Sequence, residues 1–232
     1  MPQMIVVTDL TRFKRKDIVC LAGIDPQTNK CIRPLPYIRT ESCKKLKIFP
    51  GGKLVGEFTP SNKRGKPHTE DSNHNGNITF HGAASSSVFK KVLDDSRFES
   101  VNDGFGFDLE VGQKSIPDTH RGPRSIITLQ VNPDALEVVP NNYDKGKIKA
   151  HFHDPSGHKF SYVAITDLGF HDYAMEHHAR NELAELNAWL HRQKHLYLRI
   201  GLGQPFNGAF WLQVNGIYTF PDKHPLVRSY TD

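Results

Sequence analysis

The chain has 232 residues, of which 37% are hydrophobic and 24% are charged, and its formal net charge is +5 at pH 7. This balance predicts a soluble globular protein with a mild bias toward polyanions, and the absence of any apolar run of about eighteen residues excludes a transmembrane helix. The first residues lack the basic and apolar segments of a signal peptide, so we expect a cytoplasmic protein with no membrane partner. The three cysteines form neither a disulfide framework nor paired zinc knuckles, and we expect no metal and no cofactor.

The first half of the chain reads as strands, then a short helix, then weaker strands. Residues 17–25 are apolar enough for a buried strand, and residues 30–33 return after a polar turn until two prolines end the pairing. A third strand is predicted at residues 53–58, and serines at positions 85–87 can cap a short helix. Residues 116–124 are rich in proline and glycine and contain no long flexible linker. We therefore predict two domains, residues 1–118 and 119–232, that pack on each other.

The second half gives the clearer pattern, with three strands, one long helix and two further strands. The helix is predicted over residues 172–193, because apolar side chains recur there every three or four residues. Asp172 is placed to accept the first free amide protons as its N-cap. An OB-fold, a five-stranded Greek-key barrel that binds oligonucleotides or oligosaccharides, has its helix at this point of the order. The strands are expected at residues 125–131, 147–153, 160–163, 196–200 and 210–214.

Several stretches together resemble a bacterial family, the dual OB-containing domain. They are IVCLAGI (18–24), CIRP (31–34), PHTED (67–71), HRGPRS (120–125), ITDLGF (165–170), YLRIGL (197–202) and WLQVNGIYTFPD (211–222). The resemblance spans nearly the whole chain and implies two OB-like barrels with a nucleic-acid-binding role, but it carries no catalytic residue over to this sequence. The predicted fold is therefore mainly β with one long helix, built as two tandem OB-like barrels packed together.

One face of the strand at residues 147–153 is rich in basic groups. Alternation places four side chains on the face opposite the apolar one, and the hairpin partner adds Lys159 or Tyr162, depending on the register. These strands are the second and third of the expected barrel, whose outer face is the usual oligonucleotide platform, so we expect DNA or RNA as the partner. The alternative is an ordinary solvated charged face. The four side chains are Lys147, Lys149, His151 and His153.

Aromatic and guanidinium groups of the later strands extend this predicted site. Tyr197, Phe206 and Trp211 are candidates for stacking on bases. Arg199 suits a bidentate phosphate or base contact, or alternatively a structural ion pair with Asp167 or Glu185. Aromatic residues in small barrels are also commonly core or interface residues.

A second hypothesis is an enzyme or small-molecule sensor with a polar pocket between the two halves. His68, Glu70 and Asp71 place an imidazole beside two carboxylates, and His120 and Arg121 approach them if the halves pack together. Such a group could perform acid–base chemistry or bind a divalent cation. The sequence has no phosphate-binding loop, nucleophile elbow or zincin motif, which favours a binding protein over an enzyme. A third hypothesis is an adaptor subunit with a protein partner.

Overall fold

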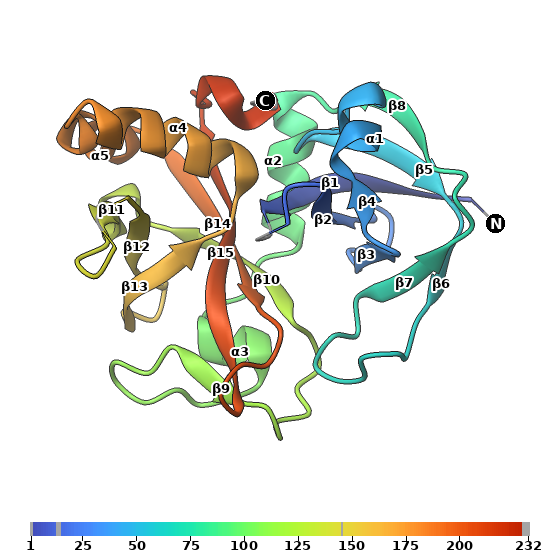
Figure 1. Ribbon diagram of the computed structural model, residues 1–232, viewed down its shortest axis with the longest axis horizontal. Helices are drawn as coiled ribbons and strands as arrows, with labels where there is room; N and C mark the ends of the chain where they lie inside the picture. The colour runs from blue at the N-terminus through green and yellow to red at the C-terminus, as the bar shows by residue number, and fades with distance from the viewer. Residues whose placement is uncertain (1, 13–14, 145, 229–232) are drawn as a thin grey trace.

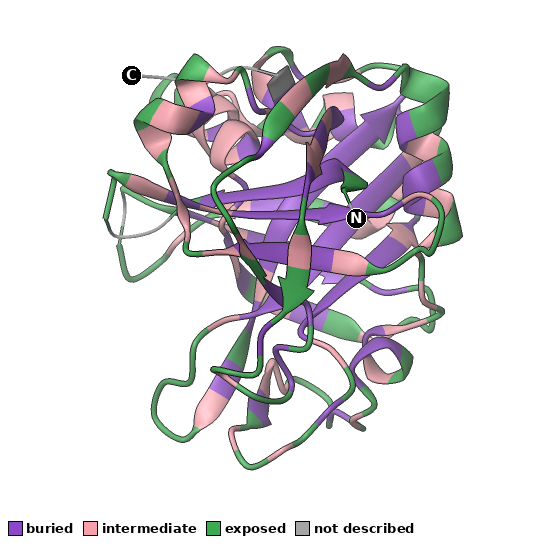
Figure 2. Ribbon diagram, turned by 90° about the vertical axis from the view of Figure 1, so that its right-hand side faces the viewer, coloured by how far each residue is buried: buried purple, intermediate pink, exposed green. Residues whose placement is uncertain are grey.

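Two curled β-sheets lie side by side and carry five short α-helices between them and around them (Figure 1). The computed structural model describes residues 2–12, 15–144 and 146–228. Buried residues run along the central strands, and exposed residues concentrate in the loops and on the outer faces of the helices (Figure 2). No helix in these three ranges is both long enough and apolar enough to cross a membrane.

The first sheet has the order β6-β7-β3-β2-β1-β5-β8. The third strand along the chain, β3, runs parallel to β7, and the other neighbours in this order are antiparallel. Only one residue, Glu57, separates β5 from β6, so the two form one nearly continuous strand. Its β5 part pairs with β8 and its β6 part pairs with β7. The elements are β1 (Gln3–Arg12), β2 (Ile18–Ile24), β3 (Cys31–Leu35), β4 (Ile38–Arg39), α1 (Thr40–Lys45), β5 (Gly52–Gly56), β6 (Phe58–Pro60), β7 (Asp71–His74) and β8 (Thr79–Ala83).

The second sheet repeats this plan with the order β10-β14-β15-β13-β12-β11. Here β13 runs parallel to β15, and β10 and β11, which follow each other in the chain, stand at the two ends of the order. A 3₁₀ turn at Pro133–Ala135 separates them, so together they serve as a bent first strand. The elements are β10 (Ile126–Val131), β11 (Leu136–Pro140), β12 (Ile148–His153), β13 (Lys159–Ile165), β14 (His195–Leu202) and β15 (Ala209–Phe220). The predicted mainly β, OB-like character of both halves is confirmed.

The prediction of one long helix at residues 172–193 is wrong. The chain forms α4 (Leu168–Ala179) and α5 (Leu183–His191), separated where Asn181 adopts a left-handed conformation with φ 59. Asn tolerates that conformation better than other side chains do. The spacing of apolar residues does not reveal the break, because Leu186 and Leu190 of α5 are buried as they would be in one continuous helix. The N-cap is Asp167, whose side chain accepts from the Phe170 amide, and Asp172 lies inside α4.

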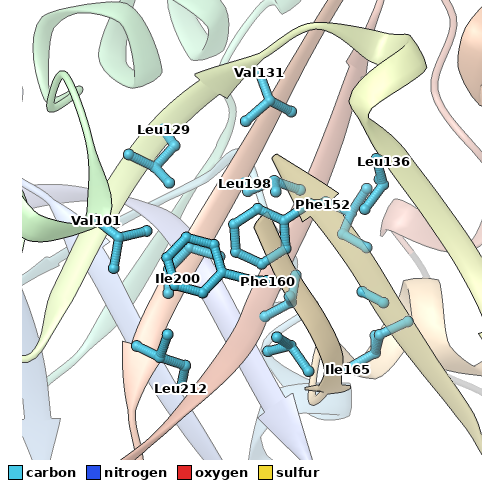
Figure 3. Close-up of a cluster of buried hydrophobic side chains, with 14 of the residues drawn as sticks. Val101, Leu129, Val131, Leu136, Phe152, Phe160, Ile165, Leu198, Ile200 and Leu212 are labelled. Carbon is cyan, nitrogen blue, oxygen red and sulfur yellow. The ribbon is translucent and has the colours of Figure 1, made fainter. Parts of the chain in front are cut away.

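The helices α2 (Ser86–Asp95) and α3 (Val101–Phe105) connect the two halves, followed by β9 (Ser115–Pro117). Val101 and Phe105 belong to the core of the second sheet, and β9 pairs with β15. Residues 101–117 therefore pack with the second half, although the boundary was predicted after residue 118. That core contains Phe152, Phe160 and Leu198 (Figure 3). The second helix packs instead in a cluster shared by both halves, which contains Val6, Ile24, Ala84, Phe89, Val92, Leu93, Tyr197, Tyr218, Phe220 and Val227. The two halves therefore share a buried apolar interface.

Candidate nucleic-acid interface

The hairpin β12–β13 lies on the side of the second sheet that faces away from the first (Figure 1). Its apolar side chains, Ile148, Ala150 and Phe152, are buried in the second core. Lys149 and His151 alternate with them and are partly exposed. This is the alternation that the sequence predicts, because successive side chains of a strand point to opposite faces. His153 is exposed at the end of β12, opposite the exposed Lys159 of β13.

A β-bulge shapes the middle of this hairpin. Ala150 pairs with Val163 and Phe152 pairs with Phe160, so the partner strand carries one extra residue at this point. Tyr162 lies in the bulge with φ 55, a left-handed conformation that few residues other than glycine adopt. Its ring packs edge-on against His151 with centroids 4.5 Å apart. The bulge therefore turns a partly exposed tyrosine onto the basic face.

A hollow of about 430 Å³ is formed on this face by strand and loop residues. The loop between β11 and β12 supplies Tyr143, whose side chain is almost fully exposed, and Asn142, which donates to the Tyr162 hydroxyl at 2.9 Å. Lys114 reaches in from the segment before β9 and donates to the Ser161 carbonyl at 3.0 Å. The lining residues are Lys114, Asn141, Asn142, Tyr143, Lys149 and Tyr162.

The charge of this hollow is positive and uncompensated. Among the described residues, neither Lys114 nor Lys149 has a carboxylate within ion-pair distance. Burial lowers the pKa of Lys149, and the positive charges of Lys114 and Lys147 lower it further. Burial also lowers the pKa of Lys114 and of His151. An anion placed here would relieve the repulsion between the lysines.

Three other predicted contact residues, Lys147, Phe206 and Trp211, do not line this hollow. Lys147 is exposed and pairs with Asp144 at 2.6 Å, a contact that solvent largely screens. Phe206 is exposed in the loop between β14 and β15, and its carbonyl accepts from the Trp211 indole at 3.1 Å. Trp211 is also partly exposed, and the next residue of β15 bonds through its amide to the Lys114 carbonyl. Phe206 and Trp211 are thus bonded to each other, and one backbone hydrogen bond joins their strand to the segment that carries Lys114.

Two predicted contact residues, Tyr197 and Arg199, are sealed between the halves. Arg199 is 1% exposed and donates to the Asp9 carboxylate at 2.9 Å and to the Thr128 hydroxyl at 2.6 Å. Tyr197 is fully buried and donates to Asp94 at 2.5 Å. Alternation correctly separates these side chains from Leu198 and Ile200, but the face that they occupy is covered by the first half. Neither is available to a nucleic acid in this structure.

The expected ion-pair partners of Arg199 were also wrong. Its carboxylate is Asp9 of the first half, and neither Asp167 nor Glu185 bonds to it. The two residues are 190 positions apart in the chain. No local sequence signal identifies such a pair, because it arises only when the two halves dock.

The predicted polar pocket is only partly assembled. His68, Glu70 and Asp71 lie around Arg33, whose guanidinium also donates to the Ser125 hydroxyl at 3.3 Å, whereas His120 and Arg121 bond to other groups. Glu70 accepts from the Ser125 and Ile126 amides at 2.6 and 2.9 Å, which fixes the loop of the first half to the start of β10. His120 lies within 3.2 Å of the Phe105 carbonyl, and Arg121 is exposed and donates to the Asp118 carbonyl. These contacts hold loops in place, and none of them joins His120 or Arg121 to His68, Glu70 or Asp71.

The other members of the predicted pocket form a buried ionic cluster. Asp71 is paired with Arg33 at 2.6 Å and with Arg64 at 2.5 Å. His68 lies 3.0 Å from Arg33, and its pKa is lowered to about 4 by burial and by the two arginines. The imidazole is therefore neutral at pH 7, its Nδ1 atom accepts from Arg33, and its buried Nε2 atom has no hydrogen-bond partner.

A separate cleft of about 760 Å³ does lie between the halves. Glu70 and Arg199 contribute to its lining, whereas His68, Asp71, His120 and Arg121 do not. Sequence reasoning also missed Lys114, Asn142 and Tyr143 on the outer face. No sequence pattern around Lys114 indicates a site. Asn142 and Tyr143 lie in a polar stretch that is typical of an ordinary turn.

The match to known families covers most of this architecture. A family model described as a dual OB-containing domain matches residues 4–217. The chain belongs to the dual OB-containing domain family. The two sheets share one plan: β3 runs parallel to β7 and β1 pairs with β5 in the first half, and β13 runs parallel to β15 and β10 pairs with β14 in the second. No curated protein and no solved structure matches the chain.

Proposed function

We propose that this dual OB-containing domain protein binds single-stranded nucleic acid on the outer face of the β12–β13 hairpin. The observation that supports the proposal most directly is the hollow beside Tyr143 and Tyr162, in which Lys114 and Lys149 have no carboxylate partner within the described part of the chain. Lysine ammonium groups neutralise phosphates, and exposed aromatic rings stack on unpaired bases, which are the two elements of single-strand recognition.

The position of the hollow within the fold supports the same proposal. OB-folds bind oligonucleotides on the face of their second and third strands and with the loops that join strands 1 to 2 and 4 to 5. In the second half these are β12 and β13, the loop at residues 141–147 and the loop at residues 203–208. The hollow lies on those strands and the first loop, and Phe206 lies in the second. This supports the proposal, because Tyr143 and Phe206, the most exposed aromatic side chains of the described part of this half, lie in the two loops that OB-folds use for binding.

The positions of the lysines suggest a path for the phosphate backbone of the bound nucleic acid. Lys147, Lys149 and Lys159 lie on the hairpin, and Lys114 adjoins them. Neutralising four phosphates on a single strand gives a slope of log Kd against log salt of about 3, since each contact contributes roughly 0.7. We expect the amide groups of Asn141 and Asn142 to add hydrogen bonds to a base held against Tyr143.

The test measures fluorescence anisotropy of a labelled single-stranded oligonucleotide across a salt series. The Lys149→Glu variant should bind at least tenfold more weakly and show a smaller salt slope, because one cation is replaced by an anion. Tyr143→Ala should weaken binding by about 1 to 3 kcal/mol, the contribution of one stacked base, with no change of slope. The tyrosine is 97% exposed, so its removal leaves the fold intact.

A matched control is the charge reversal Lys45→Glu on α1, a helix of the first half that lies on the opposite side of β14 and β15 from the hairpin (Figure 1). It changes the net charge by the same amount as Lys149→Glu and lies away from the hairpin. If Lys45→Glu and Lys149→Glu reduce affinity equally, the interaction is non-specific and the proposed face is wrong. Tight binding of a duplex with no binding of the single strand would also contradict the proposal.

A further inference from the structure

The cleft between the two halves has the size and position of a small-molecule site. Its volume of about 760 Å³ lies within the range of roughly 300 to 1,000 Å³ that is usual for ligand pockets, which often form between domains. The first half contributes the turn between β2 and β3 and part of β6 and β7, and the second half contributes the segment that enters β10. This cleft is distinct from the hollow on the outer face, with which it shares no residue.

The acidic groups in the lining are already occupied by other partners. Both oxygens of Glu70 accept hydrogen bonds from the start of β10, including the Ser125 hydroxyl at 2.9 Å. Asp95 is paired with Lys91 at 2.7 Å on the surface of α2. Glu70 also raises the pKa of the buried Arg33 guanidinium, so each carboxylate of the lining has a cation close by.

The basic groups in the lining are more available. Lys30 is exposed in the turn, and among the described residues it has no ion-pair partner. Arg124 lies over the Phe98 ring at 4.3 Å and donates to the Gly104 carbonyl, so its charge is not neutralised. Arg97 donates to the side-chain oxygen of Gln130 at 2.6 Å and lies 3.9 Å from Asp94. Three cations around one cleft attract an anion such as a phosphate.

The remaining lining is suited to a planar group with a polar edge. Phe58 and Phe98 provide aromatic surface, and Gln3 and Asn29 provide carboxamides that both donate and accept hydrogen bonds. Nucleobases combine a flat π-face with donors and acceptors along one edge, and Asn and Gln are common readers of such edges.

We propose that this cleft binds a nucleoside monophosphate, with the phosphate near Lys30, Arg97 and Arg124 and the base against the aromatic and amide groups. The site is independent of the strand-binding face proposed above. Because its walls come from both halves, a bound nucleotide also bridges them and stabilises their docking.

The first experiment is isothermal titration calorimetry of the full chain with AMP, GMP and inorganic phosphate. We expect saturable binding of at least one nucleotide and much weaker binding of phosphate alone. The double variant Lys30→Glu, Arg97→Glu should lose at least tenfold in nucleotide affinity. Lys45→Glu, which adds one negative charge away from the cleft, and Lys149→Glu on the outer face should each retain the affinity of the parent protein.

A second variant tests the base edge without changing the charge. Asn29 has φ 57, so Asn29→Gly keeps the backbone of the turn free of strain while removing the carboxamide. It should weaken the preferred nucleotide about threefold to tenfold and leave phosphate binding unchanged. We expect this variant to fold as the parent does, because glycine adopts a positive φ without strain, so its result does not depend on the stability of the charge-reversed protein.

Several outcomes overturn the proposal. These are the absence of nucleotide binding at millimolar concentration, equal affinity for inorganic phosphate and nucleotide, and unchanged affinity in both cleft variants. If the cleft variants weaken only oligonucleotide binding, the cleft is part of a strand path and no mononucleotide site exists there. Loss of oligonucleotide binding in Lys149→Glu with intact nucleotide binding would support both sites independently.

Discussion

Arg199 and Lys149 belong to the same half of the molecule, yet their surroundings give them opposite roles. Arg199 is buried against Asp9, Thr128 and the Cys31 sulfur, and although burial alone would lower its pKa, Asp9 and Cys31 raise it. Lys149 stands on the outer face beside another lysine, with its pKa lowered. A cation with a complete set of partners is structural, whereas a cation whose neighbours repel it favours an external anion.

The same distinction separates the carboxylates of the first half from the lysines of the second. Asp9, Glu70 and Asp71 are all buried, and each bonds to a residue far away in the chain. They fix the two halves and their loops in one arrangement. The predictions below test this division between an inner ionic layer that stabilises the fold and an outer basic face that is free to bind.

The largest effect is expected for Arg199→Met. The substitution leaves the Asp9 carboxylate buried without its cation, and such losses destabilise proteins by about 3 to 5 kcal/mol. Urea denaturation followed by circular dichroism measures the change in the free energy of unfolding. The double variant Asp9→Asn, Arg199→Met should recover part of the loss. A double variant as unstable as the sum of both single variants would show that the pair does not act as a unit.

A smaller loss is expected for Glu70→Gln. The neutral amide weakens the bonds from the Ser125 and Ile126 amides, and hydrogen bonds to a charged group contribute about 1.5 to 3 kcal/mol. The matched control is Glu185→Gln on the exposed surface of α5, which should change stability by less than about 0.5 kcal/mol. Equal effects of the two substitutions in urea denaturation would contradict the assigned role of Glu70.

The third prediction concerns His224, which is buried between the rings of Tyr173 and Phe170. Burial lowers its pKa to about 3, and neither ring nitrogen has a hydrogen-bond partner. The folded state therefore keeps the imidazole neutral while the unfolded state binds a proton below about pH 6.5. The free energy of unfolding is therefore highest above pH 6.5. It falls by up to about 1.4 kcal/mol per pH unit as the pH drops from 6.5 toward 3.

His224→Phe should flatten this dependence, because phenylalanine fills the same stack without a titratable group. Unfolding by urea at pH 7, 6, 5 and 4 measures the slope for both proteins. His68, whose pKa is also lowered by burial, contributes a further part of the slope down to about pH 4 that the substitution leaves in place. An unchanged slope in His224→Phe would mean that this imidazole is protonated in the folded protein.

The smallest change of stability is expected for Lys149→Glu. Its charge is partly screened, and reversing it removes the repulsion from Lys114 and Lys147. The free energy of unfolding should shift by no more than about 0.5 kcal/mol, while oligonucleotide affinity falls at least tenfold. Thermal unfolding of the variant beside Lys45→Glu provides the comparison. A large loss of stability would place Lys149 among the structural cations.

The sequence alone determined the strands of the second half and the side chains that share each strand face. Strand periodicity is local, so the alternation of Lys149 and His151 with Ile148 and Phe152 is visible without any structure. Family resemblance across several short motifs predicted the two OB-like halves. The break at Asn181 escaped notice, because the helical period continues on both sides of a left-handed residue.

Only the tertiary structure decided which of those faces meets solvent. Tyr197 and Arg199 alternate with apolar neighbours as clearly as Lys149 does, but the first half covers their side of β14 with Asp9 and α2. The hollow on the outer face likewise needs Lys114, a bulge at Tyr162 and a loop residue, Tyr143, to meet from separate parts of the chain. Contacts between distant segments depend on how the halves and strands pack, and a local pattern carries no information about that packing.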